Sequence, residues 1–298
     1  MDEMNPAAGK VIGVTSAFVC FAHYLGFPCI GYSHGSIHEQ IAEVTLEIRK
    51  DSSDALLYLK RGELLRYDRD WQAALSDLDR AASLDPALDL VALARGKVLY
   101  EGGWYDRSKS VLDQFLVRNS NHLDALITRA RVLRHLGQNL AAAVDYTQAL
   151  ASMTDPRPEH YIERAQALIP EGVEYWPTVI AGLDEGIAVL GNIVTLQLMA
   201  IDLEVKLKSY DQALHRLTAL ADQSPRKEKW LYRRGEILSA AGRLLEARSS
   251  LSQALKNIEE LPAQKRKMKT TQNLESEIRS ALGRVERRIH LEANHGAS

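Results

Sequence analysis

The sequence predicts an all-α fold built from helix-turn-helix repeats that stack into a solenoid. The first observation behind this prediction is a small or apolar anchor residue that returns at a nearly constant interval, within the range of periods that marks helical repeats. The six anchors are Gly62, Gly96, Ala130, Ala165, Ile201 and Gly235. The second observation is an alanine that follows most anchors at one fixed offset, as Ala74, Ala142, Ala213 and Ala247.

The pattern resembles the tetratricopeptide repeat family over about residues 53–262. In that family a small residue lies in the first helix of each repeat, an alanine opens the second helix, and a large residue, a small residue and a proline follow. Leu78, Ala81 and Pro86 fill these last places in the first repeat. The resemblance implies about six repeats in a right-handed superhelical solenoid with a capping helix at each end. It implies no chemistry, because the pattern residues are packing residues.

Two repeats depart from the pattern. Repeat two has Phe115 where a small residue is usual, so we expect its helices to pack differently. Repeat four carries a short insertion in the turn 170–177 before Val179 resumes the register. We expect the largest irregularity of the solenoid at this turn. Tyr175 and Trp176 could form an exposed contact there, but a role in filling the gap between neighbouring repeats is favoured.

An arginine precedes the anchor in five of the six repeats, where the family commonly has leucine. The five are Arg61, Arg95, Arg129, Arg164 and Arg234, and only Ala200 breaks the series. Asp77 and Asp145 occupy equivalent places in the second helices of repeats one and three. The spacing therefore predicts arginine–carboxylate pairs within a repeat. A stabilising role through half-buried arginine stems is favoured over ligand binding.

Composition and motifs argue against catalysis. The 298 residues carry a net charge of −2, so no overall field favours nucleic acid or membrane. Both cysteines, Cys20 and Cys29, precede the repeats, which leaves the array without a thiolate site. Gly31, Ser33 and Gly35 match the spacing of a nucleophile elbow, but that chemistry needs a sheet and everything downstream is helical in pattern. We predict no enzymatic activity and no cofactor.

The N-terminal segment predicts export. Residues 11–30 are rich in apolar side chains, contain no Asp, Glu, Lys or Arg, and lead into small residues, as a secretory signal does before its cleavage site. We predict that residues 1–33 are a signal peptide cleaved near Ser33, and that the protein is periplasmic or in the cell envelope. The alternative is a membrane anchor formed by residues 11–30, since the run approaches the ~20 residues needed to span a bilayer.

Residues 34–52 can be interpreted as a metal site or as a capping helix. His34 and His38 are candidate metal ligands, because imidazole suits copper, zinc or nickel and cleavage at Ser33 would give His34 a free amino group. The alternative function is accordingly a metal-handling envelope protein with the repeats as its docking arm. Ser36 and Glu39 match a capping box, however, and apolar residues follow at helical spacing. An N-terminal capping helix over 37–50 is therefore favoured.

A second capping helix is predicted within residues 263–298, ahead of a short tail. Its apolar stripe consists of Leu274, Ile278, Leu282, Val285 and Ile289. A solenoid needs such a helix with a polar outer side. The basic residues between Lys265 and Lys269 could touch acidic lipid or nucleic acid, but a solvated helix start is favoured because four charges make a weak electrostatic footprint.

The resemblance implies that partners bind to the concave groove, which exposed positions of the first helices line. Register from the anchors gives the candidate groove residues Arg66, Tyr67, Lys97, Tyr100, Arg131, Arg134, Gln166 and Tyr232. The first three repeats are net basic on this face, which favours an acidic or carboxylate-bearing peptide. Leu59 and Glu63 stand where chaperone-binding arrays carry a lysine–asparagine carboxylate clamp, so we predict no chaperone co-factor.

These inferences predict a non-catalytic protein–protein interaction scaffold of the cell envelope. It would bind a peptide or a partner protein in its groove. We expect no nucleic acid partner, and contact with a membrane only through an uncleaved N-terminal segment.

Overall fold

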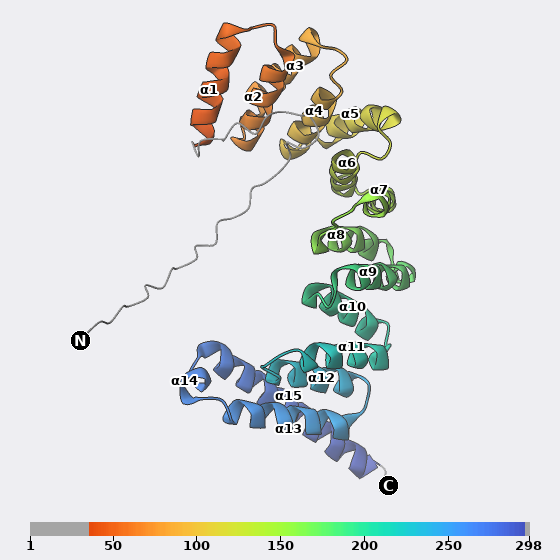
Figure 1. Ribbon diagram of the computed structural model, residues 1–298. Coiled ribbons are helices and arrows are strands. Elements are labelled where there is room, and N and C mark those ends of the chain that lie inside the picture. Colours follow the sequence, from red (N-terminus) through yellow and green to blue (C-terminus); the bar gives the residue numbers. More distant parts are fainter. Residues whose placement is uncertain (1–35, 296–298) are drawn as a thin grey trace, which may run out of the picture.

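The computed structural model describes residues 36–295, and every regular element in that range is a helix (Figure 1). The first helices of the six repeats are α2 (Ala55–Tyr67), α4 (Leu90–Glu101), α6 (Leu123–His135), α8 (Pro158–Leu168), α10 (Val194–Lys206) and α12 (Glu228–Ala240). The second helices are α3 (Trp71–Leu84), α5 (Tyr105–Arg118), α7 (Asn139–Ser152), α9 (Trp176–Leu190), α11 (Tyr210–Asp222) and α13 (Leu244–Glu259). The predicted all-α solenoid is confirmed.

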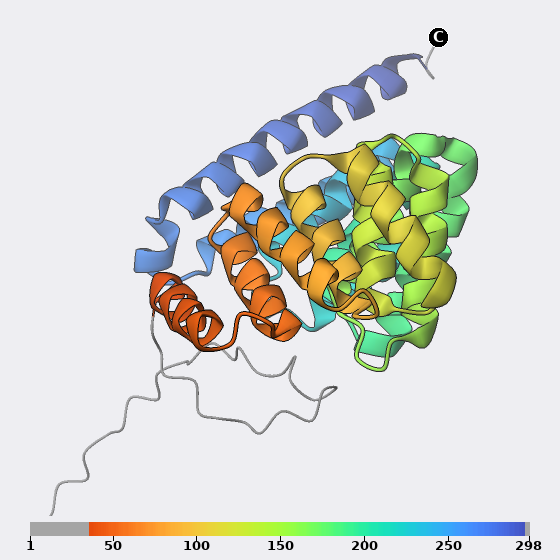
Figure 2. The same ribbon diagram turned by 90° about the horizontal axis from the view of Figure 1, so that it is seen from above.

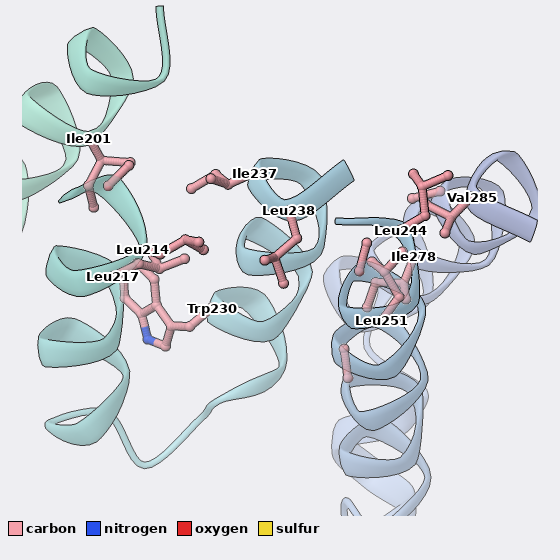
Figure 3. Close-up of a cluster of buried hydrophobic side chains, with 14 of the residues drawn as sticks. Ile201, Leu214, Leu217, Trp230, Ile237, Leu238, Leu244, Leu251, Ile278 and Val285 are labelled. Atoms are coloured by element: carbon pink, nitrogen blue, oxygen red, sulfur yellow. The ribbon is translucent and has the colours of Figure 1, made fainter. Parts of the chain in front are cut away.

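The pairs follow one another along a curve whose inner side carries the first helices. In Figure 1, α6 and α8 lie toward the inside of this curve, while α7 and α9 lie on its outside. Each repeat packs mainly on its neighbours in the chain, so the core is a continuous series of clusters rather than one centre. Figure 3 shows the last cluster, where Leu217 and Trp230 meet between α11 and α12, and where Leu251, from α13, and Ile278 meet further along.

The small anchors allow close contact between the two helices of a repeat. A Cβ atom added at Gly96 would lie 2.6 Å from the Leu112 side chain, and one at Gly235 would lie 2.6 Å from Leu251. Such distances are shorter than a normal carbon–carbon contact, so glycine permits the observed packing. In repeat five the anchor is Ile201, which is fully buried in the last core cluster.

The two irregular repeats place their unusual residues in the core and in the turn. In repeat two, Phe115 is buried and its ring meets the His122 ring edge-on at 5.2 Å. In repeat four the inserted turn forms two short 3-10 helices, η1 (Ile169–Glu171) and η2 (Val173–Tyr175). Trp176 Nε1 donates a hydrogen bond to the Ile169 carbonyl at 3.3 Å, and the ring packs against a core cluster. The packing role of Trp176 is therefore confirmed.

The predicted arginine–carboxylate pairs form in repeats one and three. Arg61 donates through Nε and Nη2 to the two carboxylate oxygens of Asp77, at 2.7 Å each. Arg129 binds Asp145 in the same bidentate way, again at 2.7 Å, and also reaches Asp113 of the preceding repeat at 2.9 Å. Because Asp145 is almost fully buried, this pairing removes the cost of an isolated buried charge.

The other members of the arginine series differ. Within the described residues Arg95 pairs only with the exposed Asp79 of the preceding repeat, at 2.6 Å, and Arg164 binds Glu185 at 2.7 Å. Arg234 forms no salt bridge within residues 36–295. In repeat five, where Ala200 interrupts the series, Arg216 of the second helix occupies the junction instead.

Arg216 makes the contacts that Ala200 cannot make. It binds both oxygens of Asp184, at 2.6 and 3.0 Å, and Glu204 at 2.7 Å. Glu204 stands one helical turn after the anchor, where the other five repeats have leucine. It is 2% exposed, and its second oxygen, Oε2, has no hydrogen-bond partner. Burial raises the pKa of this carboxyl group, and Arg216 opposes that shift.

Helices at both ends flank the repeats. The capping box before α1 (Ile37–Lys50) forms, with the Glu39 amide donating to Ser36 Oγ at 3.3 Å and the Ser36 amide donating to the Glu39 carboxylate at 2.6 Å. At the other end come α14 (Ala263–Arg266) and α15 (Lys269–His295), and Ile278 and Val285 of α15 are buried. Figure 2 shows α15 running along one side of the array.

None of the helices in the described range is long and apolar enough to cross a bilayer. The predictions made for residues 1–33, the signal peptide and the alternative anchor at 11–30, lie outside the described residues.

Candidate functional site

Two adjoining hollows lie where the first four repeats meet. The first, of about 290 Å³, is called the arginine hollow and is lined by Tyr100, Arg131, Arg134, His135, Asn139, Glu163, Gln166 and Pro170. The second, of about 500 Å³, is called the aromatic hollow and is lined by Arg69, Trp71, Tyr100, Glu101, Tyr105 and His135. Tyr100 and His135 line both, so the hollows form one surface, called the front site.

The repeat period brings these side chains together. Tyr100 and Arg134 are one repeat period apart and lie in the last turn of the first helices of repeats two and three. Trp71, Tyr105 and Asn139, also spaced by one period, are the first residues of successive second helices. Since each repeat presents the same turn on the same side, the ends of the first helices and the starts of the second helices form one edge of the groove.

Aromatic rings form two walls of the front site: the stacked pair Tyr105 and His135 is one wall, and Tyr100 is the other. The Tyr105 and His135 rings are stacked, with centroids 4.3 Å apart and planes within 7°. The Tyr100 ring is tilted by 49° to Tyr105 and by 57° to His135, with centroids 6.1 and 5.8 Å away. Burial raises the pKa of Tyr100, so its hydroxyl stays protonated at neutral pH. Tyr100 therefore adds no negative charge to the front site.

The carboxylates of the front site are already paired. Glu163 receives hydrogen bonds from Arg131, with Nε 3.1 Å from one oxygen and Nη2 3.0 Å from the other. Glu101 is paired with Arg66, which is itself only 7% exposed and also binds Glu63 at 2.9 Å. These contacts offset the negative charges that would otherwise repel an acidic ligand.

Two arginines of the front site have no carboxylate partner among the residues that the structure describes. Arg134 donates through Nη2 to the neutral side-chain oxygen of Gln166 at 3.1 Å. Arg69 is exposed, has a left-handed backbone with φ of 64°, and forms no ion pair in this range. Each hollow therefore contains one cation that can bind an incoming anion.

The structure brings together four of the eight predicted groove residues. Tyr100, Arg131, Arg134 and Gln166 all line the arginine hollow. Tyr232 belongs to the last repeat and packs against the C-terminal core cluster, away from the other seven.

Three of the four predicted groove cations are paired with carboxylates. Arg66 is buried between two carboxylates, Lys97 Nζ lies 3.0 Å from Asp124, and Arg131 is held by Glu163. Next to them, Tyr67 is 65% exposed and lies under the Arg66 guanidinium at 4.2 Å. These cations hold neighbouring repeats together, so only Arg134 of the four predicted cations has no carboxylate partner within residues 36–295.

Three lining residues, Trp71, Tyr105 and Asn139, come from second helices and were not among the predicted groove residues. Their signal was present in the sequence, because all three follow an anchor at the same offset. Arg69 was also missed, since it lies in the turn rather than in a helix.

The candidate metal ligands are not brought together as a site in the described range. His38 Nδ1 lies 3.6 Å from an oxygen of Asp68, and no group of three or more His, Cys, Asp or Glu suited to a metal occurs in residues 36–295. His34 lies outside the described residues.

Comparison with known proteins agrees with the repeat pattern. Residues 93–158 and 198–262 match the tetratricopeptide repeat family model. The C-terminal part of a repeat-containing protein from Cytophaga hutchinsonii has a similar fold, with a TM-score of 0.58, 15% identity, and coverage of 80% of this chain and 94% of that one. A tetratricopeptide repeat protein from Parabacteroides merdae gives a TM-score of 0.48 at 15% identity over 81% of this chain and 92% of that chain.

No curated protein matches the sequence. The repeat fold nevertheless defines the class of the chain as a helical repeat protein. Within that class, the stretches 93–158 and 198–262 are similar to the tetratricopeptide repeat family, whose members are generally non-catalytic scaffolds for protein–protein interaction.

Proposed function

We propose that this protein is a non-catalytic scaffold that binds a peptide or a partner protein at the front site of its groove. The observation that carries the proposal is the pair of adjoining hollows that share Tyr100 and His135. Together they offer stacked rings, amide side chains and two arginines without carboxylate partners in the described chain. A concave surface that combines apolar walls with a few polar groups is the usual form of a binding site.

The charges of the front site favour an acidic partner. Glu101 and Glu163 are matched by Arg66 and Arg131, while Arg69 and Arg134 are not matched by any described carboxylate. A carboxylate on the partner would complete the missing pairs and would speed association through the local field.

We further propose that the scaffold acts in the cell envelope. The support is the uncharged run at residues 11–30, which has the character of a secretory signal or an anchor. Fractionation followed by intact-mass measurement tests this proposal. A species that starts near His34, or a full-length species in the membrane, supports an envelope location, whereas a full-length cytosolic species contradicts it.

Charge reversal tests the front site. The double variant Arg69→Glu, Arg134→Glu should lose the partner that the parent captures from its own host, because two attractive charges become repulsive. Neither residue belongs to a salt bridge in the described range, so the melting temperature should not change. The matched control is Arg248→Glu, an exposed arginine of α13 that lines neither hollow.

Partners are identified by mass spectrometry and then tested in purified form. Loss of binding in the double variant, with parental binding in the control, supports the front site. Equal binding by all three proteins would show that the partner docks elsewhere on the solenoid.

A further inference from the structure

We infer the chemical class of the ligand at the front site: a peptide segment that places a neutral aromatic side chain in the aromatic hollow and a carboxylate on Arg134 in the arginine hollow. This inference rests on the proposed function, because it names what the scaffold recognises. It follows from the geometry of the rings, from the unequal pairing of the arginines, and from the residues that the two hollows share.

The aromatic hollow is built for a ring. Four of its six lining residues, Trp71, Tyr100, Tyr105 and His135, carry aromatic rings. Tyr105 and His135 form a flat stacked wall, and Tyr100 meets that wall at a tilt of 49° to one ring and 57° to the other. A planar side chain can stack on one wall and meet the other edge-on, which are the two arrangements that aromatic pairs prefer.

Aromatic walls also attract cations, so the alternative ligand is a lysine or arginine side chain. The charges at the hollow disfavour it. Arg69 lines the hollow and has no described ion-pair partner, while the one lining carboxylate, Glu101, is already held by Arg66. A second cation would meet repulsion from Arg69 without gaining a free carboxylate. The occupant of the aromatic hollow should therefore be neutral.

The arginine hollow provides the acid-binding half. A guanidinium has five N–H donors, and Arg134 uses Nη2 to bind the amide oxygen of Gln166 at 3.1 Å. A ligand carboxylate binds a guanidinium more strongly than a neutral amide does, and it can accept two parallel hydrogen bonds. Arg131 does not compete for that carboxylate, because Glu163 already occupies its Nε and Nη2.

The shared residues set the spacing of the two ligand groups. Tyr100 and His135 line both hollows, so a ring stacked on them lies beside the arginine hollow. The carboxylate must then come from the same residue as the ring or from one close to it in the peptide. It can be the side chain of Asp or Glu, or the terminal carboxylate of a peptide that ends in an aromatic residue. The two sources present the same group to Arg134.

Labelled synthetic peptides test the inference with the full-length protein. The parent peptide is an octapeptide of Gly, Ser and Gln with one Phe, one Asp placed two positions later, and an amidated end. Matched peptides change Phe to Ser, Phe to Lys, or Asp to Asn. A further peptide has no Asp but ends in Phe with a free carboxylate. Dissociation constants are measured by fluorescence anisotropy.

We expect the parent peptide to bind at least about tenfold more tightly than the Ser, Lys and Asn peptides, since each change removes one of the two recognised groups. Tight binding of the peptide ending in Phe would identify the terminal carboxylate as the source, and weak binding would identify the acidic side chain. Equal binding of the Lys peptide, or no difference between Asp and Asn, would overturn the inference.

Protein variants assign each preference to its hollow. Arg134→Gln should abolish the preference for Asp over Asn while keeping the preference for Phe over Ser. His135→Ser, a change at an exposed residue, should do the reverse. If neither variant alters its preference, the inference fails. If the natural partner still depends on Arg69 and Arg134 while peptides show no such preferences, the inference fails but the proposed function stands.

Discussion

Repeats three and five build the same junction from different residues. In repeat three, Arg129 of the first helix binds Asp145 of its own repeat and Asp113 of the preceding one. In repeat five, Arg216 of the second helix binds Glu204 of its own repeat and Asp184 of the preceding one. Each guanidinium therefore contacts two partner helices, although the arginine comes from a different helix in each case.

In both repeats an arginine lies at the junction with the preceding repeat, but a different helix supplies it. Arg129 is equally far along the chain from each of its two carboxylate partners. Ala200 lies midway between Asp184 and Arg216 at that same separation, so Asp184 and Arg216 occupy the positions of Asp113 and Asp145. The arginine has moved to the last of the three positions, and Glu204, from outside the series, supplies the second carboxylate. The move leaves Glu204 buried with one unpaired oxygen, a feature that repeat three does not have among its described carboxylates.

The largest expected effect comes from removing the cation of repeat three. Arg129→Leu leaves Asp145 buried without a partner and should lower the free energy of unfolding by about 3–5 kcal/mol. Urea denaturation followed by circular dichroism measures the loss. Arg95→Leu is the matched control, because its partner Asp79 is exposed and the cost should stay below about 1 kcal/mol. Equal losses would mean that burial of the carboxylate does not set the strength of the junction.

The second largest effect is expected at the glycine anchors, where two repeats leave different amounts of space for a side chain. Gly96→Ala places a methyl group 2.6 Å from Leu112 and should destabilise the protein by about 1–3 kcal/mol through overpacking. Gly62→Ala should cost less, because its nearest side-chain atom lies 3.2 Å away. The melting temperatures of both variants are compared with the parent. A larger loss at Gly62 would contradict the packing described for the front repeats.

In repeat five, Glu204→Gln should raise stability at pH 7 by about 1 kcal/mol, because it removes a buried charge while keeping the oxygen that accepts from Arg216. Burial raises the folded-state pKa of Glu204 above its ordinary value of 4.5. The protonated carboxyl group therefore contributes its full stability below pH 4.5, and this contribution is lost as the pH rises through the folded-state pKa. The difference between parent and variant should therefore vanish at pH 4. Melting temperatures at pH 4 and pH 7 measure it, and a constant difference would contradict the account.

The smallest expected effect is a loss of stability at acidic pH, caused by two histidines near repeats three and four. His122 Nδ1 accepts a hydrogen bond from the Ala125 amide at 3.4 Å, and His160 Nδ1 accepts one from the Arg157 amide at 3.1 Å. Burial lowers the pKa of both, so their contribution to stability is present above pH 6.5 and is lost as pH falls through the folded pKa. This sign is opposite to that of Glu204.

We expect the parent to lose about 1 kcal/mol more than a His160→Asn variant between pH 7 and pH 5, because asparagine keeps an acceptor that does not titrate. Urea midpoints at the two pH values provide the measurement. A parental loss no greater than that of the variant would assign the acid sensitivity to other groups.

Sequence reasoning recovered the features that repeat. The anchors fixed the helix pairs, and the equivalent positions of Asp77 and Asp145 predicted their pairing with Arg61 and Arg129, because packing recurs at constant spacing. Arg216 was not predicted, since the series was followed only at the position before the anchor. A search for charge pairs at the Arg129–Asp145 spacing, in both directions along the chain, would have pointed to this junction.

Only part of the front site was predicted, because only some of its residues recur at the positions that were followed. Register along the first helices found Tyr100, Arg131 and Arg134, but it counted charges without their partners in the next repeat. The pairing of Lys97 with Asp124 depends on how two repeats dock, which the period alone does not specify. Trp71 was missed for a different reason, because it is the first residue of a second helix and only first helices were considered.

The residues of helix α1 affect whether a further repeat could be added before it. Its bounds, 37–50, are those of α3 moved back by one repeat period, so the described fold begins with the second half of a repeat. Gln40 and Glu47 stand where α3 has Ala74 and Ala81, the small residues that let a first helix approach. A designer who wished to graft a further repeat before residue 37 would need alanine at both positions. By register, Gln40 and Glu47 therefore replace the small residues that α3 offers to its first helix.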